Sequence, residues 1–160
     1  MTLHENNYNG LAALSSTIRQ LTLKRLTEIP NEFINWRLNT SALSFGHLVQ
    51  HILDVDELFF SLNTSENKYK WILGTNEPHI NLDQATYQAM LEKLKIYDAK
   101  RSEIIKSFTQ QSINKVIKNE NNEAMTIWWF LMHNVLEHET YHRGQIAAYL
   151  KILKGESTRV

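Results

Sequence analysis

The chain has 160 residues, with 17 basic and 17 acidic side chains and no formal net charge at pH 7. That length suits one domain with a sizeable core, and 42% hydrophobic residues argue against a disordered chain. Because the charge is balanced, neither a nucleic acid nor an anionic membrane surface is an expected partner. The sequence has no cysteine, which excludes disulfides and thiolate metal sites. A metal ion would need His, Asp or Glu ligands.

Two further features bear on location and fold class. No stretch approaches the roughly 18 apolar residues of a membrane span. The polar N-terminal residues, which include Glu5, do not resemble a signal peptide, so we expect a cytoplasmic protein. Glycine and proline are scarce, with five and two copies, and this scarcity disfavours a strand-rich fold.

The first predicted helix covers about residues 11–28, and Pro30 ends it. We expect its apolar stripe to face the core; the stripe consists of Leu14, Ile18, Leu21 and Leu26. A second helix is predicted over about residues 43–62, with Ser44 as its N-cap. One face of that helix is apolar apart from a histidine, and it consists of Leu48, His51, Ile52, Val55, Leu58 and Phe59.

A long polar connection over residues 63–82 follows, and we expect it to cross the bundle or to cover one end. A third helix is predicted over about residues 83–108. The INKVIK segment at residues 113–118 is either a short extended piece or a plain loop.

The fourth and longest helix is predicted over about residues 123–154, with Gly155 as its C-cap. Its inward stripe repeats with a spacing close to 3.5, as in helix bundles. The stripe consists of Ile127, Leu131, Asn134, His138, Tyr141 with His142, Gln145, Ala148 and Ile152. We therefore predict an all-α fold, a four-helix bundle with a long connection between its second and third helices, as a single domain over residues 1–160.

Polar residues interrupt the inward stripe of the fourth helix, and two of them are histidines. His138 and His142 lie one turn apart, so both imidazoles can reach one divalent ion. His51 interrupts the apolar face of the second helix, and a neighbouring helix lies close enough for it to complete a three-histidine site. Three protein ligands leave a position open for water or substrate. The alternative is that these are core histidines with hydrogen-bonded neighbours.

The other histidines are weaker candidates. His47 lies four residues before His51 and is either a fourth ligand or a residue of the pocket or surface, the latter being favoured. His133 is rotated away from His138 and is interpreted as a non-ligand. His4 and His79 fall in polar segments, where we expect them to be solvated.

The segment from His138 to His142 also matches HExxH, which makes Glu139 a weak candidate for a general base; the alternative is a solvated side chain. A zinc protease is disfavoured, because no third ligand follows at the spacing that such enzymes use. A di-iron site is disfavoured as well, because a second Glu-x-x-His element is absent.

Several neighbours are candidates for the surroundings of the site. Asp54 and Glu57 either orient a ligand or belong to a solvated acidic face. Asn134 and Gln145 bracket the two histidines and are pocket candidates. Arg143 either binds a substrate carboxylate or forms a surface salt bridge. Trp128 and Trp129 are adjacent and cannot both face one core, so one of them is a candidate for a subunit interface or the pocket rim.

The segments GHLVQHILDVDELFF (46–60) and HNVLEHETYHRGQIAAYLKILK (133–154) resemble the DinB family of metalloenzymes. The second is the more specific, above all HETYHRGQI. The resemblance implies a four-helix bundle that binds one divalent metal ion, usually nickel or zinc, through His51, His138 and His142. It also implies a homodimer.

The resemblance further implies a small-molecule substrate and chemistry at the metal. Characterised members activate a low-molecular-weight thiol, bacillithiol or mycothiol, and transfer or isomerise with it. We therefore predict a metal-dependent enzyme, a thiol S-transferase that acts on an electrophile. The alternatives are a metal-dependent hydrolase that uses bound water and a non-catalytic bundle that binds a metal or a small molecule.

Overall fold

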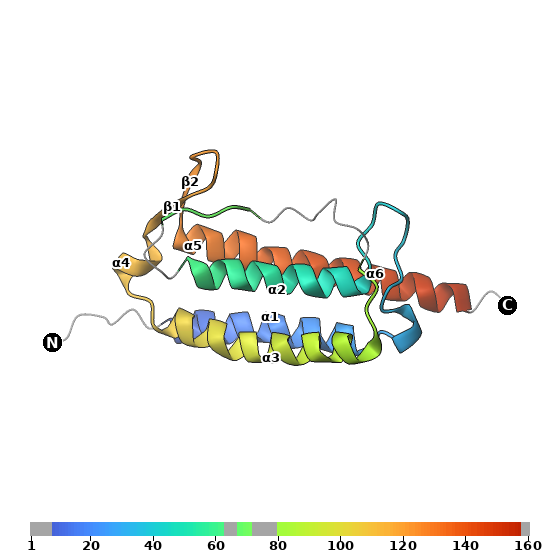
Figure 1. Cartoon of the computed structure of the whole chain (residues 1–160). Coiled ribbons are helices and arrows are strands. Elements are labelled where there is room, and N and C mark those ends of the chain that lie inside the picture. Colours follow the sequence, from blue (N-terminus) through green and yellow to red (C-terminus); the bar gives the residue numbers. More distant parts are fainter. Residues whose placement is uncertain (1–7, 63–66, 72–79, 158–160) are drawn as a thin grey trace.

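The computed structural model describes residues 8–62, 67–71 and 80–157, with side chains up to residue 155. Its long helices are α1 (Asn9–Thr27), α2 (Phe45–Ser61), α3 (Gln84–Lys106) and a C-terminal helix that ends in α6 (His138–Ser157). In Figure 1, α2 and the C-terminal helix lie as one pair along the pair formed by α1 and α3. The predicted four-helix bundle is confirmed.

The starts of two helices follow directly from their capping residues. Ser44 caps α2 as predicted, because its hydroxyl oxygen accepts the backbone N–H of His47 at 3.2 Å. The carboxylate of Asp83 accepts the backbone N–H of Thr86 at 2.7 Å and begins α3. A short 3-10 turn, η1 (Asn31–Phe33), follows Pro30 between α1 and α2.

The segment before the C-terminal helix forms a small β-hairpin beside a short helix, α4 (Gln110–Ile113). Strand β1 (Val116–Lys118) pairs antiparallel with β2 (Ala124–Thr126), so the extended alternative for INKVIK is the correct one. The predicted start of the fourth helix at Glu123 is wrong. Residues 124–126 are held by the strand pairing, and the Thr126 hydroxyl then caps the helix by accepting the N–H of Trp129 at 3.1 Å.

The C-terminal helix changes its winding before the histidines. A short α-helical start, α5 (Ile127–Trp129), leads into a π-helical segment, η2 (Phe130–Glu137), and then into α6. A π-helix has wider turns than an α-helix, so the residues that face inward differ from a strict helical count. Tyr141, predicted to face inward, is 67% exposed. The helix also runs through Gly155 to Ser157, so the predicted C-cap at Gly155 is wrong.

The buried face of α1 is not the predicted apolar stripe. Leu14 and Leu21 are nearly half exposed, and the interior face carries polar side chains instead. The residues buried on α1 are Ala12, Ser15, Arg19, Thr22, Leu23 and Leu26. The stripe prediction holds for Leu26, which is buried, and for Ile18, which packs against the core, but it is wrong for Leu14 and Leu21 because it assumed that only apolar residues face the interior.

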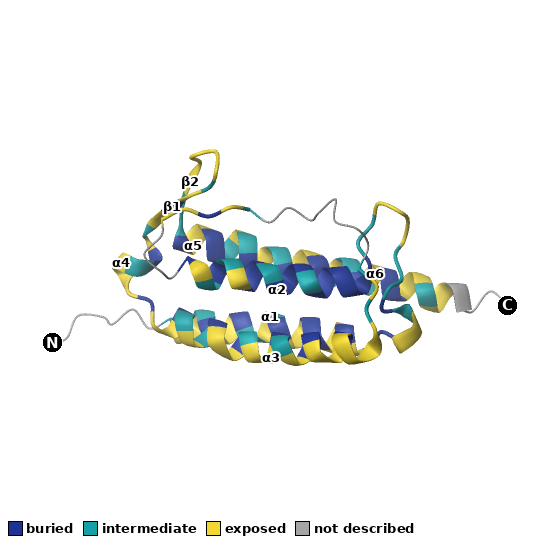
Figure 2. Ribbon diagram, viewed as in Figure 1, coloured by how far each residue is buried: buried dark blue, intermediate teal, exposed yellow. Residues whose placement is uncertain are grey.

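The core consists of two apolar clusters, one toward each end of the bundle. On α1, Ala12 belongs to one cluster and Leu23 to the other; on α3, Ile105 and Leu94 are divided in the same way. Buried polar side chains lie between the two clusters, among them Arg19 on α1, Arg101 on α3 and Glu139 on α6, so a polar layer crosses the bundle at mid-length. Figure 2 shows buried residues along the facing sides of the helices. Among the described residues, no helix combines the length and apolar character of a membrane span.

Candidate metal centre

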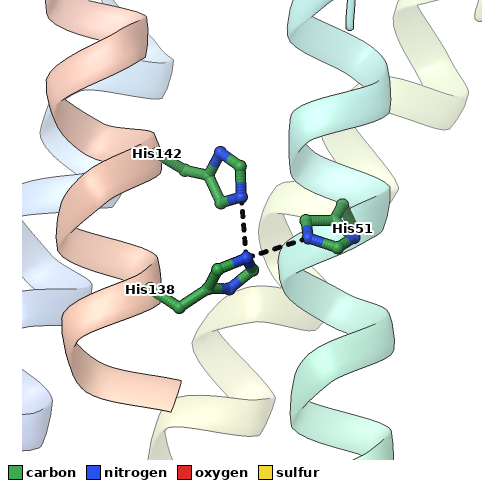
Figure 3. Close-up of side chains that lie close together, drawn as sticks. All are labelled: His51, His138 and His142. Carbon is green, nitrogen blue, oxygen red and sulfur yellow. Dashed lines mark hydrogen bonds between the residues drawn. The ribbon is translucent and has the colours of Figure 1, made fainter. Parts of the chain in front are cut away.

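Three histidines meet at the polar layer between α2 and α6. The Nε2 atom of His138 lies 3.1 Å from that of His51 and 3.0 Å from that of His142. Figure 3 shows the three rings turned toward one another, one from α2 and two from successive turns of α6. His51, His138 and His142, here called the histidine trio, form a group whose ligand atoms lie within 4.8 Å of one another.

The two distances from His138 to its neighbours in the histidine trio fit ligands of one divalent ion. Two nitrogen ligands with bonds of 2.0–2.1 Å to one ion lie about 3.0 to 3.4 Å apart, depending on the coordination angle. The two measured distances fall in this range. Without an ion, a single Nε2 proton on His138 can serve only one of its two neighbours, so one of these close contacts is not a complete hydrogen bond. One ion would satisfy all three nitrogen atoms.

Burial keeps the histidine trio uncharged. Burial and then the charge on His142 lower the pKa of His51 from 6.5 to about 4. Burial, followed by the charges on His142 and His51, lowers the pKa of His138 to about 4 as well. Burial also lowers the pKa of His142. Neutral imidazoles carry the lone pair that a metal ion requires, so at neutral pH the trio is in its ligating form.

The orientation of His142 is set by a side chain from the next turn of α6. The Nδ1–H of His142 donates to Gln145 Oε1 at 3.0 Å, and Gln145 Nε2 donates to the Tyr149 hydroxyl at 2.9 Å. This pairing places the proton on Nδ1 and leaves the Nε2 lone pair directed at the other two rings. Gln145, predicted from its spacing as a pocket residue, therefore contacts a candidate ligand directly.

His47 is buried but is not brought to the histidine trio. Its Nε2 accepts the backbone N–H of Ile80 at 3.1 Å, and its Nδ1 lies 3.2 Å from the Ser44 hydroxyl. Both ring nitrogens are therefore used to hold the start of α2 and the segment before α3. A fourth imidazole ligand has no support in this geometry. His133 is exposed and contacts Glu137 through its Nδ1 at 2.6 Å, whereas His4 and His79 lie outside the described residues.

Glu139 is neither solvated nor free to take up a proton. Its side chain is 2% exposed, so the solvated alternative is wrong. Burial alone would raise the pKa of Glu139, but Arg19 and Arg101 outweigh it and lower the pKa to about 2. A carboxylate held by two guanidinium groups is a weak base, so the geometry gives the HExxH match no base.

Three of the remaining candidates contact residues outside the histidine trio. Glu57 is exposed and bonds Lys93 on α3, while Asp54 accepts from Gln50 on its own helix. Asn134 lies near the hairpin, with its Nδ2 3.7 Å from Met125 Sδ. Arg143 is half-buried, and its Nη1 has no hydrogen-bond partner among the described residues.

Two features near the histidine trio were missed by the sequence analysis. Arg19, Asp56, Arg101 and Glu139 form a buried group of four charges, here called the charge cluster. The available signal was the presence of charged residues among apolar neighbours on all four long helices. The other feature is Trp71, whose ring centre lies 5.8 Å from that of His138. Tyr141 approaches His142 in the same way at 5.1 Å, so aromatic rings flank two of the three imidazoles.

Comparisons with known proteins agree with this architecture. The solved structure of YfiT from Bacillus subtilis has a similar fold, with a TM-score of 0.71 at 11% sequence identity. The match covers 96% of this chain and 91% of YfiT, which is described as a probable metal-dependent hydrolase with an unusual four-helix bundle topology. No curated protein matches the sequence significantly. The model of the DinB family matches residues 5–155, nearly the whole length, and the chain therefore belongs to the DinB family.

Proposed function

We propose that this protein is a metal-dependent enzyme in which His51, His138 and His142 hold one divalent ion, nickel or zinc. The observation that carries the proposal is the convergence of three neutral imidazole Nε2 atoms in a buried layer. Imidazole is a good ligand for both metals, so the donor set supports either one. Three protein ligands leave at least one coordination position for a small molecule.

We further propose that the enzyme activates a low-molecular-weight thiol for transfer to an electrophilic substrate. A divalent ion at this position supplies a Lewis acid that lowers the pKa of a thiol or a water molecule bound to it. An ordinary thiol has a pKa near 8.5, far below that of water, so it needs no general base. A reaction without a general base suits the site, because the nearby carboxylates Asp56 and Glu139 both bond Arg101 and are not available as bases.

The chain's own residues prepare the site in two ways. Gln145 holds the proton of His142 on Nδ1, away from the ligand position. The rings of Trp71 and Tyr141 lie edge-on beside His138 and His142 and restrict the positions that these two imidazoles can take. The absence of cysteine from the sequence is consistent with a thiol that arrives as a cosubstrate.

A hydrolase that uses water at the ion is the second candidate. The observation that favours it is the similarity of fold to YfiT, which carries that description. The two candidates differ in one measurable respect, since only the transferase requires a thiol for turnover. A bundle that binds the ion without turnover is the remaining outcome.

Metal analysis of protein purified without a histidine tag tests the proposed centre. We expect about one divalent ion per chain in the wild type and loss of most of it in His51→Ala, His138→Ala and His142→Ala, with helicity retained. His47→Ala is the matched control, because His47 is a buried histidine of the same helix whose ring nitrogens bond elsewhere. Wild-type metal content in all three trio variants would refute the assignment.

Turnover assays with the metal-loaded protein then separate the candidate reactions. We expect an alkylating electrophile to be consumed only when a thiol such as bacillithiol or mycothiol is added. Consumption of ester or amide substrates without thiol would favour the hydrolase. Stoichiometric metal with no turnover in either assay would favour the non-catalytic bundle.

We also propose a homodimer that uses the exposed apolar face of α1 and the start of the C-terminal helix. Trp128 and Trp129 are both exposed, and a groove beside them is lined by Leu14 and Ile18. Exposed aromatic patches of this kind often mark interfaces. Sedimentation analysis should give a dimer for the wild type and a monomer for Trp129→Glu.

A further inference from the structure

The charge cluster is buried at the same level of the bundle as the histidine trio. All four of its side chains are at most 2% exposed, and its two positive and two negative charges balance. Buried charges are costly unless geometry and hydrogen bonding are nearly complete. A group of this kind placed beside a candidate metal centre therefore needs an explanation beyond the folding of an apolar bundle.

The four charges are distributed over the helices in a simple pattern. The carboxylates come from the two helices that carry the histidine trio, Asp56 from α2 and Glu139 from α6. The guanidinium groups come from the other two helices, Arg19 from α1 and Arg101 from α3. The two like-charged carboxylates have no direct attraction, so each depends on the arginines.

Each arginine joins both carboxylates. Arg19 donates to Asp56 at 2.7 Å and to Glu139 at 2.8 and 3.0 Å, and its remaining Nη1 donates to the carbonyl of Leu94 at 3.0 Å. Arg101 donates from one nitrogen, Nη1, to Asp56 at 3.0 Å and to Glu139 at 2.9 Å. Ser15 accepts its other donors, with Oγ at 2.7 Å and the carbonyl at 3.2 Å. Arg19 therefore bridges α2 and α6 through Nε and Nη2, whereas Arg101 bridges them through Nη1 alone while its other nitrogens are held by Ser15 of α1.

The bridge is adjacent to the histidine trio on both helices. Glu139 directly follows His138 on α6, and Asp56 lies five residues after His51 on α2. His138, Asp56 and Arg101 line one small cavity that has no room for a water molecule. A change in the spacing of the two carboxylates would therefore be passed to the imidazoles without a fluid layer to absorb it.

We propose that the charge cluster is a positioning device for the metal centre: Arg19 and Arg101 fix the separation of α2 and α6 and so hold His51 at ligating distance from His138 and His142. The expected effect of the charge cluster on metal binding rests on the proposed function. Its expected effect on the spacing of α2 and α6 does not depend on that function. A guanidinium group is planar and holds its nitrogens in a rigid arrangement, so the bonds of Arg101 to Ser15 fix the position of the Nη1 atom that bridges the carboxylates; the ammonium group of a lysine is a single donor atom and lacks that anchorage.

The variant Arg101→Lys tests the device, because it keeps the positive charge and removes the Nε and Nη2 donors that anchor the guanidinium group to Ser15. We expect the affinity for Zn²⁺ or Ni²⁺, measured by competition with a chelator, to fall about tenfold or more, as for other residues that support metal ligands. Helicity should remain. If Arg101→Lys does not fold, the double variant Arg101→Met/Glu139→Gln replaces it, since it leaves the neutral pair of Arg19 and Asp56.

Two controls separate positioning from general stability. Ile105→Ala removes buried apolar contacts one turn further along α3 and should lower the unfolding midpoint while leaving metal affinity nearly unchanged. Lys93→Met breaks an exposed pair with Glu57 that also joins α3 to α2, and it should change neither quantity. Wild-type affinity in Arg101→Lys would overturn the proposal, as would an equal loss of affinity in Ile105→Ala.

A measurement on the metal-free protein keeps this test separate from the proposed function. Because the sequence has no cysteine, Ser61→Cys on α2 and Tyr141→Cys on α6 can be spin-labelled selectively at exposed positions. We expect Arg101→Lys to shift or broaden the distance distribution between these labels and Ile105→Ala to leave it unchanged. An unchanged distribution in Arg101→Lys would overturn the proposal. A shift in a protein whose wild type binds no metal would leave the helix spacing supported and the proposed function refuted.

Discussion

The polar layer of this bundle holds two buried groups side by side, and they differ in how completely their polar atoms are satisfied. In the charge cluster, both arginines bond both carboxylates and each has a further acceptor. In the histidine trio, three Nε2 atoms approach one another with too few protons to bond them all. Both groups are buried and hydrogen-bonded to protein, but of the two only the histidine trio has nitrogen atoms whose close contacts cannot all be complete hydrogen bonds.

This difference is a guide to function. A buried polar group whose hydrogen bonds are all made within the protein needs no ligand. A buried group with converging lone pairs is completed by a cation. The contrast explains why the histidines, rather than the more numerous charges next to them, are the candidates for chemistry.

The largest expected effect is on the free energy of unfolding, and it comes from removing one arginine of the charge cluster. Arg19→Met leaves Asp56 and Glu139 buried with one guanidinium between them, so we expect a loss of about 3–5 kcal/mol in the free energy of unfolding. Urea denaturation measures it. Lys93→Met, at an exposed pair, is the comparison and should cost less than about 1 kcal/mol. Similar costs for the two variants would mean that the charge cluster is not integral to the fold.

Removing a residue of the histidine trio should lower the affinity for a metal ion much more than the stability of the fold. We expect His138→Ala to lower Zn²⁺ affinity by at least about 100-fold, the upper range for residues that only support ligands. Isothermal titration with and without competing chelator measures the change. His133→Ala removes an exposed histidine of the same helix and should leave affinity unchanged. Equal affinities in the two variants would contradict the assignment of His138.

A smaller effect is expected at the side chain that orients His142. Gln145→Leu removes the acceptor of the Nδ1–H, so we expect metal affinity to fall about 10- to 100-fold. Tyr149→Phe keeps Gln145 and removes only its second hydrogen bond, and it should give a smaller loss. The same titration ranks the two variants, and a larger loss in Tyr149→Phe would show that Gln145 does not act on His142 directly.

The two groups should also respond to acid in different ranges of pH. His51 and His138 bind protons below about 6.5 when unfolded and below about 4 when folded, so the metal-free protein should lose stability as the pH falls between these values. Glu139 binds its proton near 4.5 when unfolded and near 2 when folded, so its contribution should be lost at lower pH. Denaturant midpoints across pH measure both ranges.

A double variant assigns the upper range. His51→Asn/His138→Asn should flatten the loss of stability between about pH 6.5 and 4 and keep the loss at lower pH. An unaltered profile would mean that other groups titrate there, and the neutral state of the histidine trio would then need another explanation.

Much of the fold could be predicted from the sequence, because local rules govern it. Ser44 is a good N-cap in any context, and the apolar periodicity of residues 48–59 requires a buried helix. The match at HETYHRGQI, with His51 on another helix, indicated which histidines would meet. Errors arose where pairing across the chain outweighed local preference, as at residues 124–126, where the strand pairs with β1.

The amino-acid sequence by itself determined that there are four long helices, which family the chain resembles and which three histidines are the candidates, since these depend on periodicity within one helix and on a recognisable motif. Only the tertiary structure decided that Leu14 is exposed and Arg19 is buried. The same holds for Glu139, whose carboxylate bonds the two arginines. The physical reason is that a buried charge is stable only beside partners from other helices, and no periodicity within one helix reveals them.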